Sequence, residues 1–229
     1  MVFATASRRS PKLFRSMSSS LPENLHVVDG PLSRQKLAVL RDEKTDTTMF
    51  RQAIKEVALI MVAEATSLMP TRTAKINTPL TETEVEEISA PVCLVPVLRA
   101  GLGMLDGSLA LLPNATVGFM GLQRDEETAE PIEYYVNLPT KLEDYLVLVL
   151  DPMLATGGSL SATLTKLKEE GATWISCLHV VSATPGVERV TAEHPDVHFY
   201  TAALDPELND DAFIVPGLGD AGDRLYGTL

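Results

Sequence analysis

A short, uninterrupted apolar run in the middle of the chain gives the clearest structural signal. Residues Leu146–Leu150 are all apolar, and five residues are too few for an amphipathic helix. The run therefore predicts a strand that is buried on both faces, as in a parallel sheet. Asp151 ends the strand, and Ala155–Ser159 form a small, Gly-rich turn. Leucines then recur at helical spacing from Leu160, and Gly171 is expected just beyond the end of that helix.

Apolar runs followed by helical spacing repeat along the rest of the chain. Further strands are predicted at Val92–Leu98, Ala115–Gln123, Trp174–Ala183 and Val197–Ala202, with helices ending at Leu112 and over Val187–Glu193. Strands that alternate with helices predict an α/β fold with a doubly wound, mostly parallel sheet.

The segment before this core predicts an N-terminal helical arm. Ser33 is a candidate cap for a short helix that ends at Leu40, and Thr47 or Thr48 for a longer helix that Pro70 ends. Apolar residues recur on one face of the longer helix. That face suggests a lid or a subunit contact, and packing on the chain's own sheet explains it equally well.

Two charged stretches lie outside the expected strands. Thr71–Ala90 is polar and acidic, which is typical of a solvated loop or hairpin. Arg124–Thr140 is long and charged, and a loop of that length beside a binding site is often a lid.

Composition narrows the classes of function. The chain of 229 residues carries a formal net charge of −12, which argues against nucleic acid or an acidic membrane surface as the main partner. No apolar run approaches the length of a membrane span. Cys93 and Cys177 lie in apolar runs and are expected to be buried free thiols, and no zinc-ligand spacing predicts a structural metal.

Residues 1–20 differ from the rest, because they contain four basic residues, many serines and no acid. This composition is typical of an organelle transit peptide and fits a disordered extension equally well. The folded domain is expected over residues 21–229. A cytoplasmic location is expected, or an organelle if the segment is a transit peptide.

The turn after Asp151 has the features of a phosphate site. Backbone N–H groups at a helix N-terminus favour a dianion, and Gly157 and Gly158 let the backbone approach it closely. Thr156 and Ser159 add hydroxyl donors. The alternative is an ordinary turn in which Ser159 caps the helix and nothing binds.

Arg99 follows a predicted core strand and needs either an anion or a carboxylate partner. An internal salt bridge and a bound anion explain it equally well by chemistry alone.

Three stretches in this order resemble the uracil phosphoribosyltransferase family, within the type I phosphoribosyltransferases: residues 95–104 around Arg99, residues 151–159, and residues 214–223. The Asp151-Pro152-Met153 form of the second stretch is similar to this family in particular. The resemblance covers roughly residues 31–228, and it implies a type I fold with a C-terminal hood over the base.

The resemblance also implies an activity and its residues. The reaction would convert uracil and 5-phospho-α-D-ribose 1-diphosphate (PRPP) to UMP and diphosphate in pyrimidine salvage. Arg99 and Asp151 would be catalytic. PRPP would bind at Arg99, Arg124, Asp151, Pro152, Met153, Leu154, Ala155, Thr156, Gly157, Gly158, Ser159 and Asp220, and uracil at Ile214, Gly219, Asp220 and Ala221. Mg²⁺ would arrive with PRPP rather than on dedicated side chains, since Pro152 and Ala155 stand where relatives carry acids. A GTP effector and a homo-oligomer are further expectations.

Two other functions compete with this one. A non-catalytic regulator of the same fold could sense pyrimidine nucleotides, but the acidic charge disfavours RNA binding. Gly217, Gly219 and Gly222 match a dinucleotide fingerprint, yet only seven residues follow, so the required helix and distant acid are missing.

Overall fold

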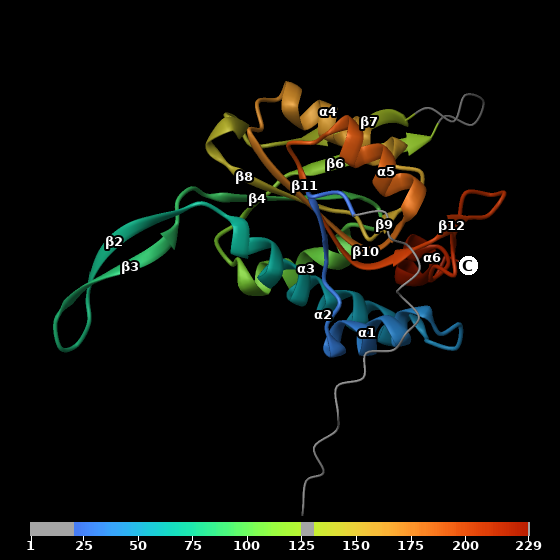
Figure 1. Ribbon diagram of the computed structural model, residues 1–229, viewed down its shortest axis with the longest axis horizontal. Coiled ribbons are helices and arrows are strands. Elements are labelled where there is room, and N and C mark those ends of the chain that lie inside the picture. Colours follow the sequence, from blue (N-terminus) through green and yellow to red (C-terminus); the bar gives the residue numbers. More distant parts are fainter. Residues whose placement is uncertain (1–20, 125–130, 229) are drawn as a thin grey trace, which may run out of the picture.

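The computed structural model describes residues 21–124 and 131–228. One central sheet carries helices on both faces (Figure 1). Its strands lie in the order β1 (Leu25–Val27), β11 (His198–Asp205), β10 (Trp174–Ala183), β8 (Leu146–Leu150), β4 (Val92–Leu98), β6 (Phe119–Arg124) and β7 (Pro131–Asn137). In this order every pair of neighbouring strands is parallel except the last pair, β6 and β7, which is antiparallel. The predicted fold class is confirmed.

Two helical layers cover the sheet. On one face lie α1 (Pro31–Arg41), α2 (Thr47–Ala65) and α3 (Leu102–Leu111), and on the other α4 (Gly158–Glu169) and α5 (Thr184–Glu193). The buried apolar side chains accordingly form two clusters, one under each layer. The shorter elements are β5 (Thr116–Val117), β9 (Met153–Leu154), β12 (Glu207–Leu208), β13 (Ile214–Val215), α6 (Ala221–Tyr226) and two 3₁₀ turns, Thr66–Leu68 and Leu142–Asp144.

The apolar face of α2 packs on the chain's own sheet. Phe50, Ile54, Val57 and Met61 follow helical spacing and are fully buried in the cluster that also contains Leu148 of β8. Of the two interpretations of this face, packing within the chain is therefore confirmed.

The helix starts differ from prediction by a few residues. Helix α1 begins at Pro31 after Gly30, and Ser33 is buried inside the helix rather than capping it. The cap of α2 is Asp46, whose carboxylate accepts from the Met49 amide at 2.9 Å. Aspartate and threonine are both good caps, so sequence alone could not choose between neighbours. Helix α2 also ends at Ala65, before the 3₁₀ turn and Pro70.

Thr71–Ala90 forms the predicted hairpin. Strands β2 (Thr71–Asn77) and β3 (Glu82–Ile88) pair with each other and project from the body of the molecule (Figure 1). By contrast, the loop predicted at Arg124–Thr140 was wrong for Pro131–Asn137, which form β7 and pair with β6. Residues 125–130 of the predicted loop lie outside the described part of the structure. The strand predicted at Ala115–Gln123 is divided at Gly118 into β5 and β6.

The strand order places a binding crevice. From β4 the chain moves outward through α3 to β6, whereas β8 leads through α4 to β10 and β11 on the other side. The order reverses between β4 and β8, which pair in parallel from Val92↔Leu146 to Pro96↔Leu150. Ligands of open α/β sheets bind at the carboxyl ends of the strands at such a reversal. Arg99 and Asp151 follow these two strands directly.

Among the described residues, no helix is both long enough and apolar enough to cross a membrane. Cys93 and Cys177 are buried free thiols as expected, and burial raises the pKa of Cys93 to about 11.

Candidate active site

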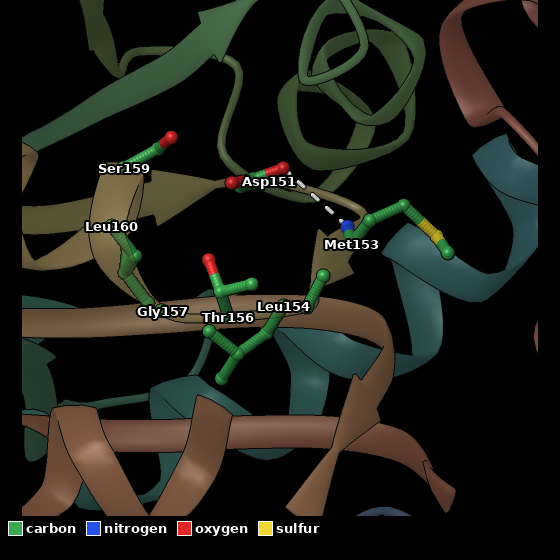
Figure 2. A pocket seen from close by; sticks show the side chains of 8 residues that line it. Asp151, Met153, Leu154, Thr156, Gly157, Ser159 and Leu160 are labelled. Atoms are coloured by element: carbon green, nitrogen blue, oxygen red, sulfur yellow. Dashed lines mark hydrogen bonds between the residues drawn. The ribbon is translucent and has the colours of Figure 1, made fainter. Parts of the chain in front are cut away.

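The turn between β8 and α4 encloses a hollow of about 110 Å³. Its lining is Asp151, Met153, Leu154, Ala155, Thr156, Gly157, Ser159 and Leu160. Seven of these belong to the predicted PRPP stretch, while Pro152 and Gly158 of that stretch do not line the hollow and Leu160 was not anticipated. Figure 2 shows the Thr156 hydroxyl pointing toward the side on which the Asp151 carboxylate lies. We call residues 151–159 the phosphate loop.

Helix α4 starts at Gly158, with Gly157 as its cap in the left-handed region at φ 80°. The alternative in which Ser159 caps the helix is therefore wrong. The first N–H groups of α4 and its dipole are directed at the loop, which suits a phosphate dianion. A side chain at position 157 would be strained by its backbone angle and would also lie 2.9 Å from Val190 Cγ1.

Gly186 of α5 packs directly against the backbone of the phosphate loop. A Cβ at this position would lie 2.1 Å from the Ala155 carbonyl oxygen and 3.3 Å from the Gly157 nitrogen. The α5 backbone thus approaches the loop backbone as closely as a glycine allows. Gly186 was not predicted as part of the site, because it stands just before the helix expected over Val187–Glu193, where a Pro-Gly pair is typical of an ordinary turn.

Asp151 sits at the carboxyl end of β8 in a poorly solvated position. Burial raises the pKa of its carboxyl to about 7, although the Met153 amide, 3.4 Å from Oδ1, favours the charged form. Without ligand, this acid is therefore only partly ionised near neutral pH. A ligand that supplies hydroxyl donors or a cation would favour the carboxylate.

His179 of β10 lies directly beneath Asp151. Its Nδ1 is 2.7 Å from the Asp151 carbonyl oxygen, so that Nδ1 carries the proton and donates. Its Nε2 is buried and has no partner within residues 21–124 and 131–228. One ring nitrogen of this buried histidine is thus paired, and the other is not paired among the described residues. Burial lowers the pKa of His179 to about 4, which keeps the ring neutral.

These two groups predict opposite pH dependences of stability. The pKa of His179 falls from 6.5 to about 4 on folding, so acidification through this range destabilises the fold. The pKa of Asp151 rises from 3.8 to about 7, so acidification through that range stabilises it. In the wild type the two effects largely cancel. Relative to wild type, Asp151→Asn should lose stability as pH falls from about 7 to 4, by at most about 1.4 kcal/mol per pH unit.

His179→Asn, which keeps an N–H donor, should gain stability relative to wild type as pH falls from 6.5 to about 4. Urea unfolding of the three proteins at several pH values from 4 to 7.5 measures both slopes. Parallel profiles for the two variants would contradict this assignment of pKa values.

Arg99 stands on the neighbouring loop. Gly101 holds this loop against the end of β8, since a Cβ there would lie 2.2 Å from the Leu150 carbonyl oxygen. The Arg99 side chain is 60% exposed, and its Nη2 lies 3.5 Å from Asp223 Oδ1. Of the two partners considered for Arg99, the structure shows a carboxylate, that of Asp223.

The C-terminal segment lies against the Arg99 loop, since Asp223 and Tyr226 both contact Arg99. Asp205 at the end of β11 accepts two hydrogen bonds from Arg41 and one from the Gly217 amide, at 2.7 to 2.9 Å. Ile214 is buried, whereas Gly219 is exposed with φ 78°. Beyond it, the predicted uracil residues Asp220 and Ala221 are the cap and the first residue of α6. These contacts fix the loop that the resemblance assigns to uracil.

The remaining predicted residue, Arg124, is the last residue of β6. Its backbone lies at the carboxyl end of the sheet beside β4, but its side chain is outside the described part of the structure. Within the described residues, no three histidine, cysteine or acidic side chains form a group that could hold a metal ion.

Comparisons with known proteins agree with this geometry. The family model of uracil phosphoribosyltransferase matches residues 27–228. The chain belongs to the uracil phosphoribosyltransferase family. Enzymes of this name from Bacillus cytotoxicus and Bacillus cereus are each 49% identical to it over 205 residues, which cover 89% of this chain and 98% of theirs.

A solved structure of a protein from Aquifex aeolicus is 35% identical to this uracil phosphoribosyltransferase family member. The match covers 88% of this chain and 97% of the other, with a TM-score of 0.83. The family, the fold and the enzymatic character expected from the sequence are therefore confirmed.

Proposed function

We propose that this enzyme transfers the phosphoribosyl group of PRPP to uracil, which yields UMP and diphosphate. Its active site would consist of the phosphate loop, the loop that carries Arg99, and the C-terminal segment around residues 214–221. The observation that carries the proposal is the donor-rich hollow at the start of α4, facing Asp151 and lying beside the Arg99 loop. Such an arrangement suits a ligand with a phosphate at one end and a pyrophosphate at the other.

Each of these three segments has one task. The phosphate loop binds the 5′-phosphate, and Asp151 accepts hydrogen bonds from the ribose hydroxyls. Arg99, with Arg124, binds the pyrophosphate. The segment around Ile214 and residues 219–221 binds uracil.

Catalysis follows from charge and position. Bond cleavage at the ribose C1 builds positive charge on the sugar and negative charge on the departing pyrophosphate. Arg99 stabilises the second charge, and the ionised Asp151 lies near the first. The hood holds the base in line with C1, which converts a bimolecular step into one within the complex. A covalent intermediate is not needed.

The side chains present fit Mg²⁺ carried in by PRPP. Asp151 is the carboxylate of the phosphate loop, and Mg²⁺ commonly binds to one carboxylate together with substrate phosphates and water. When bound, the ion would neutralise part of the pyrophosphate charge. Pro152 offers no second carboxylate, so the loop itself does not form a dedicated metal cage.

Pyrophosphate release tests the proposal directly. The enzyme is mixed with PRPP and Mg²⁺, and uracil, cytosine, orotate and hypoxanthine are added separately. Release with uracil alone is expected. Silence with every base, also after addition of GTP, would favour a regulator that only senses nucleotides, and an RNA titration at several salt concentrations would then examine that function.

Uracil is expected to be preferred over cytosine by roughly 10⁴-fold in kcat/KM. A backbone N–H that faces O4 and a carbonyl that faces the N3 proton match uracil, whereas cytosine presents an amino donor and an unprotonated N3. We assign these contacts to the backbone of Gly219–Ala221. Steady-state rates with both bases measure the ratio, and turnover of cytosine at a tenth of the uracil rate would contradict the assignment.

A GTP effector and a homo-oligomer stay predictions. The apolar face of α2, which suggested a subunit contact, is buried within the chain and does not support an oligomer. Light scattering and the addition of GTP to the assay test both.

A further inference from the structure

Helix α6 holds Arg99 at two points. Arg99 Nη2 lies 3.5 Å from Asp223 Oδ1, and the Tyr226 hydroxyl donates to the Arg99 carbonyl oxygen at 3.1 Å. Asp223 and Tyr226 are three positions apart, so both side chains leave the same face of the helix. One helical face therefore contacts both the side chain and the backbone of Arg99.

The same helix begins at residues proposed to bind uracil. The Asp220 carboxylate caps α6 by accepting from the Asp223 amide at 2.8 Å, and Ala221 is the first helical residue. Gly222 also lies against the arginine, because a Cβ at that position would be 3.7 Å from Arg99 Nη2. Whatever fixes the uracil loop therefore also fixes the carboxylate that faces Arg99.

The other face of α6 is anchored to the helical layer. The Leu225 side chain packs against Gly103 of α3, where a Cβ would lie 2.7 Å from Leu225 Cδ1. Arg51 of α2 donates to the Leu225 carbonyl oxygen at 2.6 Å. Because of these contacts, α6 is expected to move as a rigid unit when a ligand binds.

We infer that Asp223 is a positioning residue for Arg99 and makes the uracil and pyrophosphate sites bind their ligands cooperatively. The inference rests on the proposed function. Arg99 is exposed, Asp223 is partly buried and the two groups are 3.5 Å apart, so Asp223 restrains the guanidinium without locking it. The five N–H donors of arginine leave others for pyrophosphate. A base bound at the uracil loop orders α6, and Asp223 then holds Arg99 in place for pyrophosphate. By linkage, pyrophosphate must favour base binding by the same factor.

Binding of inorganic pyrophosphate to the full chain, with Mg²⁺ present, tests this inference. Calorimetry gives its dissociation constant with and without saturating UMP, and the ratio of the two constants is the coupling factor. Asp223→Asn removes the charge but leaves an oxygen that can accept from the Thr228 hydroxyl. We expect this variant to lower the coupling factor about five-fold relative to wild type. Repulsion between the UMP phosphate and pyrophosphate is common to both proteins and cancels in the comparison.

Two further variants separate positioning from a merely structural role. Thr228→Val removes the 2.6 Å hydrogen bond to the same carboxylate but leaves the Arg99 contact, so its coupling factor should equal that of wild type. In an Arg99→Ala background, Asp223→Asn should leave the factor unchanged.

A wild-type coupling factor in Asp223→Asn, with both ligands still bound, would overturn the inference and leave the proposed function intact. If the wild type bound neither UMP nor pyrophosphate, the proposed function would fail first and the inference with it.

Discussion

Replacement of Arg99 by alanine is expected to lower kcat/KM for PRPP by about 10²–10³-fold, because the leaving pyrophosphate loses a charged donor when its own charge develops. The loss should be mainly in activity rather than in stability. The side chain is 60% exposed, and its ion pair with Asp223 spans 3.5 Å. Surface substitutions of this kind change the free energy of unfolding by about 0.5 kcal/mol or less. Pyrophosphate release at several PRPP concentrations, together with a urea melt, measures both quantities.

Arg72→Ala is the matched control. Arg72 is 66% exposed and lies 3.4 Å from Glu87 in the β2–β3 hairpin, far from the crevice. Its activity should equal that of wild type. Arg99→Ala activity within ten-fold of wild type would show that Arg99 does not stabilise the leaving group.

Gly186→Ala is expected to reduce kcat/KM for PRPP by roughly 10²-fold, since a shift of about 1 Å in a positioning element can cost that much. The added methyl group would meet the Ala155 carbonyl oxygen at 2.1 Å, so either α5 or the phosphate loop has to move. The Ala155 carbonyl oxygen and the Gly157 nitrogen, which lie nearest to the added methyl group, are backbone atoms and cannot rotate away as a side chain can. The KM for PRPP should rise more than the KM for uracil, because the distortion begins in the phosphate loop.

Gly30→Ala controls for the loss of a glycine as such. No atom lies within 4 Å of a Cβ at position 30, and its φ of −101° suits any residue. Assays should be run well below the melting temperature of each variant. Equal KM values for PRPP in Gly186→Ala and Gly30→Ala would refute the role of Gly186.

The sequence predicted those parts of the site that lie at strand ends. Leu146–Leu150 and Val92–Leu98 were identified as strands because continuous apolar runs are typical of buried parallel sheets, and the structure has both with these bounds. The residues that follow them had to meet at one edge of the sheet. This adjacency is a property of topology and not of packing detail.

The missed features depend on contacts between distant parts of the chain. The approach of Gly186 to Ala155, the pair of Arg99 with Asp223 and the position of His179 under Asp151 are set by how separate elements pack. No local pattern records such distances. The strand β7 was missed for a related reason, since its pairing with β6 is a tertiary contact inside a charged stretch.

Hydrogen bonds between the N-terminal and C-terminal parts of the described chain influence the order in which the molecule can fold. Arg41 reaches Asp205 across 164 positions, and Arg224 reaches the Leu40 carbonyl oxygen across 184. Contacts of such long range close late, because the entropy of the intervening loop must be overcome first. While a ribosome is still making the chain, α1 and the start of α2 have no such partners. The segment proposed to bind the base therefore docks last, and we expect a nascent chain to release no pyrophosphate from PRPP before α6 has emerged.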